Sequence, residues 1–240
     1  MMDWEDADEE GPEWSNDKDR RKNFVGKVFF LTGAMLMVSA AIIALPLVSD
    51  EIEEAFSYNK LVIGIVALVG SSISLLALVC CHRARHIFPL NMILLIILCI
   101  SYGLIGAVVA CHYKLMVILI SFGTVVLIVI VIGIFAKWGP VDVTGCGWFM
   151  CGLSIGLTVV LTVFVIVSIF YYIPILQLVI SCLVVLVYII FLLYDMQMII
   201  GGRREQLDSD EYILGAVLLF KDVMILFLYL LEIVNAATRG

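Results

Sequence analysis

Charged side chains inside long apolar stretches are the first candidates for chemistry in this 240-residue chain. Asp195, Lys221, Asp222 and Glu232 each lie within such a stretch. A charge in hydrocarbon is energetically costly, so it usually faces the interior of a helical bundle and marks a functional site. The two aspartates are the strongest candidates, because the apolar stretches that carry them are joined by a short link.

Asp195 and Asp222 are expected at comparable depth on two antiparallel neighbouring helices. Carboxyl groups about 3 Å apart in a low-dielectric site cannot both ionise, so they share a proton and titrate as a unit. Such a pair is suited to a proton sensor or to a cation site. The alternative is that each aspartate only caps a kink or bonds to a neighbouring helix. The spacing leaves both interpretations open.

Three basic residues could modulate this pair. Lys221 adjoins Asp222, but successive residues of a helix point about 100° apart. We therefore expect Lys221 to extend toward the interface or to meet another helix. Arg83 and Arg85 lie in the basic stretch CCHRARHIFPLN. Either arginine could form a latch with an ionised aspartate, and the alternative is that both only determine topology.

The elements that must position these residues are membrane-spanning helices. The mean hydropathy is +1.15, and 63% of the residues are hydrophobic, a balance that a soluble domain of this size does not tolerate. Each apolar run has about 20 residues or more, enough to cross a hydrocarbon core about 30 Å thick. The sequence therefore predicts an all-α membrane protein with seven transmembrane helices, at about residues 25–48, 61–81, 90–111, 115–136, 146–170, 175–200 and 213–235.

Two regions follow from this pattern. Residues 1–23 are polar and carry nine of the 21 acidic residues, and we expect an acidic, disordered cytosolic tail. Residues 24–236 form the transmembrane domain. A cytosolic N-terminus places ten lysines and arginines on the cytosolic side and three on the other, which agrees with the positive-inside rule. The seventh run either crosses the membrane fully or re-enters, and the sequence leaves both open.

Several function classes lack support. The chain has no phosphate loop, HExxH or CxxC motif, and its GLSIG stretch at 152–156 is a small-xxx-small helix contact inside an apolar run. We therefore expect no enzyme activity and no cofactor. No basic stripe interleaved with aromatic residues indicates a nucleic-acid partner. A seven-helix receptor requires an extracellular N-terminus, which the charge bias opposes. The partners expected at this point are membrane lipid and a cation.

The C-terminal third resembles the Bax-inhibitor family, and within it the Lifeguard (transmembrane Bax inhibitor motif) branch. The shared pattern is an aspartate and a nearby glutamine, a Gly-x-Arg-Arg turn, a Glu-Tyr helix start and a second aspartate. In this chain the pattern comprises Asp195, Gln197, residues 201–204, Glu211, Tyr212 and Asp222. The basic stretch ending in Pro89-x-Asn91 and the sequence VDVT at 141–144 also resemble the family.

This resemblance implies a seven-helix bundle, with the seventh helix near the centre, that conducts a slow, pH-sensitive Ca²⁺ leak and suppresses cell death. Asp195 and Asp222 match the family's aspartate pair, and Arg83 or Arg85 falls in the region of its latch arginine. Ca²⁺ is then the permeant ion, and Bcl-2-type or channel proteins are expected partners. The Golgi, the endoplasmic reticulum and the plasma membrane are all possible locations.

The sequence departs from the family pattern at two places. Lys221 stands where the family usually has an apolar residue, and no acid accompanies Lys114 at the start of the fourth span. A positive charge near a conducting path repels Ca²⁺. An alternative function therefore stays open, namely a non-conducting membrane regulator that binds apoptotic or channel proteins.

Overall fold

A computed structural model describes residues 13–171 and 173–239. Within these ranges the chain is helical and contains no strand. The helices follow in the order α1 (Glu13–Ala44), η1 (Leu45–Leu47), α2 (Asp50–Tyr58), α3 (Lys60–Cys80), α4 (His82–His86), α5 (Leu90–Ala110), α6 (Leu115–Trp138), η2 (Thr144–Cys146), α7 (Gly147–Phe170), α8 (Pro174–Ile200) and α9 (Tyr212–Arg239).

Seven of these helices are long and apolar enough to cross a membrane, namely α1, α3, α5, α6, α7, α8 and α9. The predicted fold class is therefore confirmed. The spanning helices expose many large apolar side chains, especially on α3, α6 and α7, as expected of surfaces that face lipid tails rather than water. The chain is thus a multi-pass membrane protein.

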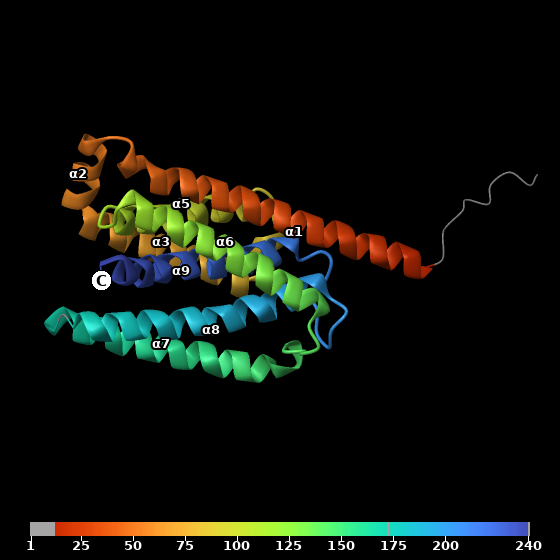
Figure 1. Cartoon of the computed structure of the whole chain (residues 1–240). Helices are drawn as coiled ribbons and strands as arrows, with labels where there is room; N and C mark the ends of the chain where they lie inside the picture. Colours follow the sequence, from red (N-terminus) through yellow and green to blue (C-terminus); the bar gives the residue numbers. More distant parts are fainter. Residues whose placement is uncertain (1–12, 172, 240) are drawn as a thin grey trace, which may run out of the picture.

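The last helix lies at the centre of the bundle. In Figure 1, α9 runs between α8 on one side and α5 and α6 on the other, and it contacts α1, α3, α5, α6 and α8. It is the most buried of the spanning helices. Its C-terminus lies at the end of the bundle opposite the α8–α9 loop, so the seventh run traverses the bundle and does not re-enter.

The N-terminal region differs from the expectation of a disordered tail over residues 1–23. The first helix already begins at Glu13, so residues 13–23 are helical, and residues 1–12 lie outside the described part of the chain. Extending an existing helix adds one hydrogen bond per residue without a new nucleation step. The sequence also did not predict α2, an acidic helix whose half-buried residues Ile52 and Phe56 share one face.

A polar clamp closes the end of the bundle near the two aspartates. Gly201 ends α8 with φ +75°, a backbone conformation suited to glycine. The Arg21 guanidinium donates hydrogen bonds to the carbonyls of Met198 (2.5 Å), Ile200 (3.3 Å) and Leu207 (2.6 Å). The first spanning helix thereby binds two carbonyls that the end of α8 leaves without helical partners, and one carbonyl of the α8–α9 loop.

The α6–α7 connection is tied to the same end of α8. The fully buried Gln197 side chain donates to the Val141 carbonyl (2.8 Å) and accepts from the Val143 N–H (3.0 Å). The Asp142 carboxylate accepts from both the hydroxyl (2.7 Å) and the N–H (3.0 Å) of Thr144. These bonds explain the local role of the VDVT sequence, and they hold α8 in a defined position two residues from Asp195.

Candidate functional site in the bundle core

Both candidate aspartates lie in the core, on helices that pack against each other. Asp195 is located on α8 and Asp222 on α9, and α8 and α9 are in extensive contact. The Asp195 side chain is buried, and Asp222 has no exposed surface. A buried carboxylate far from water requires a counter-charge, a proton or a cation. The structure therefore places these residues where the sequence predicted a polar pair.

The two carboxyl groups act on each other. Asp222 lies near enough to Asp195 for the charge of one carboxyl group to act on the other. The Lys221 ammonium lies 3.0 Å from Oδ1 of Asp222, whereas Oδ2 has no hydrogen-bond partner among the described residues. A carboxylate is only an acceptor, so a bond between two carboxyl groups requires that one of them carry a proton. The geometry is therefore suited to one shared proton.

Lys221 forms an ion pair with its neighbour, contrary to the sequence-based expectation. The ammonium nitrogen lies 3.0 Å from Oδ1 of Asp222. The expectation came from the directions of successive helical side chains, but the long, flexible lysine stem can fold back over its own helix. The other half of the expectation is correct, because Lys221 also meets α8. Its nitrogen lies 5.9 Å from the Tyr188 ring centre and 5.8 Å from that of Phe191, within cation–π range.

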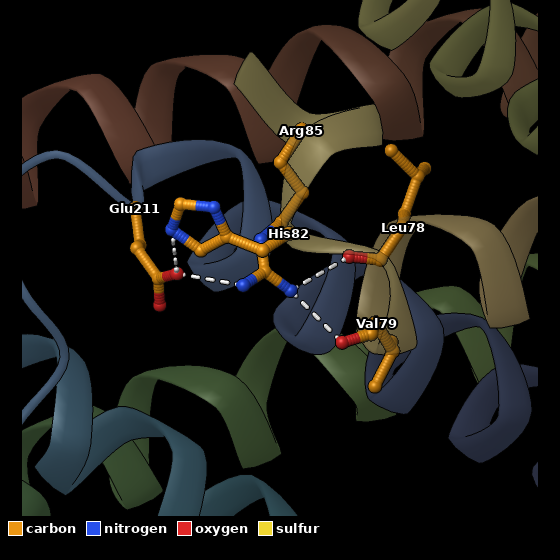
Figure 2. Close-up of polar contacts among 5 residues, drawn as sticks. All are labelled: Leu78, Val79, His82, Arg85 and Glu211. Atoms are coloured by element: carbon orange, nitrogen blue, oxygen red, sulfur yellow. Dashed lines mark hydrogen bonds and ion pairs between the residues drawn. The ribbon is translucent and has the colours of Figure 1, made fainter.

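The structure distinguishes the two candidate latch arginines. Arg85 is buried, whereas Arg83 is exposed. Figure 2 shows the Arg85 guanidinium between the end of α3 and the start of α9. It donates to the Leu78 carbonyl (3.1 Å), the Val79 carbonyl (2.8 Å) and Oε1 of Glu211 (2.7 Å).

Neither arginine is paired with Asp195 or Asp222 in the described part of the chain. The expected latch contact is therefore absent from this arrangement. Instead, Arg85 pairs with Glu211, a carboxylate that sequence reasoning used only as a family marker. Glu211 immediately precedes α9, eleven positions or about 16 Å of helix before Asp222. It therefore lies nearer the end of the membrane span, where a charge pair is less costly than at Asp222.

Sequence reasoning gave no function to a second acidic position on α9. Glu232 is half-buried and accepts a hydrogen bond from the Ser181 hydroxyl (2.6 Å). It lines a cavity of about 650 Å³ formed by α5, α8 and α9, together with Val108, Val109, His112, Tyr113, Gln177, Leu228, Tyr229 and Asn235. The sequence signal was an acidic residue within an apolar run, but the cavity exists only in the folded bundle.

The fold and the site define a polytopic membrane protein with two buried aspartates, one on the central helix α9 and one on the adjoining helix α8. Comparison with known families agrees. The family model described as "Inhibitor of apoptosis-promoting Bax1" matches residues 21–239, and the chain belongs to this Bax-inhibitor family.

The chain is also similar to curated proteins of the lifeguard group. It is 29% identical to Protein lifeguard 3 of Mus musculus, with 93% of this chain and 72% of that protein covered. The identity to Protein lifeguard 3 of Homo sapiens is 28%, with 95% and 73% covered. For Protein lifeguard 4 of Mus musculus it is 26%, with 91% and 87% covered. The resemblance predicted from the C-terminal motif is thus confirmed over nearly the whole chain.

Proposed function

We propose that this protein is a pH-sensitive Ca²⁺ leak channel of an intracellular membrane or the plasma membrane, and that it suppresses cell death by lowering stored Ca²⁺. The proposed gate is the proton shared by Asp195 and Asp222. The observation that carries the proposal is the burial of both carboxyl groups on adjoining helices, with no hydrogen-bond partner for Oδ2 of Asp222 among the described residues.

The chemistry of the pair links proton binding to cation binding. With one proton shared, the pair carries a single charge, and the adjacent Lys221 balances it. Loss of that proton adds a second negative charge, which Lys221 does not balance, in a low-dielectric site. A hard cation with a preference for carboxylate oxygens, such as Ca²⁺, then stabilises the site. Protons and Ca²⁺ therefore compete for the same oxygens.

A path to the pair is supported at one end of the bundle. Glu232 lines a cavity beside α9. Glu232 follows Asp222 by ten positions, or about 15 Å along the helix. A carboxylate in a half-buried cavity raises the local concentration of cations. We assign to this cavity the role of a vestibule that leads to the aspartate pair.

The test is Ca²⁺ flux from vesicles that contain the purified full-length protein, measured across a range of pH. Wild-type protein should give a Ca²⁺ flux that changes with pH. The double variant Asp195→Asn, Asp222→Asn should lose the pH response, because an amide neither titrates nor carries charge. An exposed acid in the adjoining loop, changed as Asp210→Asn, is the matched control and should retain it. Unchanged flux and pH response in the double variant would refute the proposal.

A second function is supported by the ion pair of Lys221 with Asp222. A fixed cation beside the gate opposes Ca²⁺ entry, which favours a non-conducting regulator that binds Bcl-2-type or channel proteins. The variant Lys221→Leu discriminates between the two. If wild-type protein conducts nothing at any pH and Lys221→Leu conducts, the lysine closes an otherwise intact path. If neither conducts and activity in cells survives loss of both aspartates, the regulator function is correct.

A further inference from the structure

Two histidines and a glutamate gather at the end of the bundle that carries the α8–α9 loop. His82 and His86 are four positions apart on α4, so their side chains lie on one face. Their ring centres lie 4.4 Å apart, with the ring planes tilted by 35°. Nε2 of His82 lies 3.8 Å from Oε1 of Glu211, the contact drawn in Figure 2. One ligand atom from each of the three residues falls within a group no wider than 4.8 Å.

We propose that His82, His86 and Glu211 form a binding site for a divalent transition-metal ion, with Zn²⁺ as the best fit. Two imidazoles and one carboxylate are a ligand set that zinc accepts, with water in the fourth position of the tetrahedron. Imidazole ligands select zinc and its neighbours over Ca²⁺ and Mg²⁺, which prefer oxygen. The site is separate from the aspartate pair and does not depend on the proposed leak.

The distances fit a site that closes on the ion. Zinc bonds of about 2.0–2.1 Å set ligand atoms roughly 3.3 Å apart around a tetrahedron. The three ligand atoms must therefore approach one another from a spread of up to 4.8 Å. The His82 side chain is 73% exposed, so its ring can rotate without disturbing the core. Solvent exposure also gives the ion a path of entry.

Arg85 orients the carboxylate of this site. Its guanidinium holds Oε1 of Glu211 at 2.7 Å and is itself fixed by carbonyls of α3. A residue that fixes a ligand carboxylate reduces the reorganisation needed for metal binding. The other oxygen, Oε2, makes no contact with the side chains drawn in Figure 2, where both dashed lines end on Oε1. Because the positive charge of Arg85 opposes a second cation, we expect a reversible site.

The consequence of binding is a link between two segments that are distant in sequence. The two histidines lie on α4, between α3 and α5, whereas Glu211 immediately precedes α9. An ion bound to all three fastens the α3–α5 connection to the start of the central helix. Since metal binds the folded arrangement and not the unfolded chain, saturating Zn²⁺ should raise the thermal unfolding midpoint.

The experiment titrates the full-length protein in detergent micelles with Zn²⁺, by calorimetry, and with Co²⁺, whose visible absorption reports tetrahedral coordination. One equivalent of Zn²⁺ should bind, and excess Ca²⁺ or Mg²⁺ should not displace it. The variant His82→Ala, His86→Ala should weaken binding by at least about tenfold, since loss of residues that only orient ligands already costs that much. His112→Ala is the control, because His112 is the third histidine and lies in the Glu232 cavity.

Two exposed cysteines next to the site require a separate control. Cys80 and Cys81 precede His82 and are thiols that can bind zinc themselves. The variant Cys80→Ser, Cys81→Ser should bind Zn²⁺ with wild-type affinity. Loss of binding in that variant, or wild-type affinity in the double histidine variant, would overturn the proposal. The substituted histidine and cysteine side chains are exposed, so their loss should not disturb the packing of the bundle. Glu211 is half-buried, so Glu211→Gln is a third variant, whose metal binding is followed by Co²⁺ absorption.

Discussion

The contrast between Arg85 and Arg83 offers a direct test of the packing described above. Both arginines lie in one short basic segment, but Arg85 is buried with three hydrogen bonds and Arg83 is exposed. Arg85→Ala removes two bonds to carbonyls at the end of α3, worth about 0.5–1.5 kcal/mol each, and one charge-assisted bond worth about 1.5–3 kcal/mol. Glu211 keeps some contact with water, since 17% of its side chain is exposed, so the lower values apply.

The expected loss for Arg85→Ala is therefore about 2.5 kcal/mol in the free energy of unfolding. For Arg83→Ala the expected change is within about 0.5 kcal/mol, as for most surface substitutions. Reversible unfolding by sodium dodecyl sulfate in mixed micelles, followed by far-UV circular dichroism, measures both. A double-mutant cycle with Glu211→Gln should give a coupling energy of about 1–2 kcal/mol. Equal losses for the two arginine variants, or a coupling energy of zero, would refute the reasoning.

Three further predictions concern the clamp that positions α8. Gly201→Ala should destabilise the protein more than Gly202→Ala. Both glycines have positive φ, but only at Gly201 does the added Cβ meet a guanidinium, at 2.6 Å. The thermal unfolding midpoints of the two variants measure the difference, and equal shifts would contradict the contact. Gln197→Ala should cost about 2–3 kcal/mol, since it removes two buried bonds to the α6–α7 connection, and a neutral result in micelle unfolding would show that the connection is not held there. The Thr144 hydroxyl lowers the pKa of Asp142. The stability from this ionised carboxylate is therefore complete above the ordinary aspartate pKa of about 3.9 and is lost as the pH falls through the lower folded value; Asp142→Asn should remove that part of the acid sensitivity, measured as unfolding midpoint against pH.

The elements of the fold follow from local sequence properties. A run of about 20 apolar residues must form a helix in hydrocarbon, because every backbone polar group needs an internal partner. The seven runs could therefore be located within a few residues at most ends. The start of α1 at Glu13 and the short helix α2 were missed. Hydropathy does not distinguish a helix from a loop in a polar segment at the membrane edge.

The sequence by itself determined that Asp195 and Asp222 are buried residues of neighbouring helices. The cost of a charge in lipid is a property of the residue and its apolar neighbours along one helix, and the short α8–α9 link makes those helices adjacent. The pattern around these aspartates also predicted the family, which the comparison over residues 21–239 confirmed.

Only the tertiary structure decided which charged groups meet. It pairs Lys221 with Asp222, Arg85 with Glu211, and places His82 beside that same glutamate. Long side chains can reach several partners from one backbone position, and the choice depends on the rotation and depth of helices that are far apart in sequence. For that reason the polar residues could be named from the sequence, but their contacts could not.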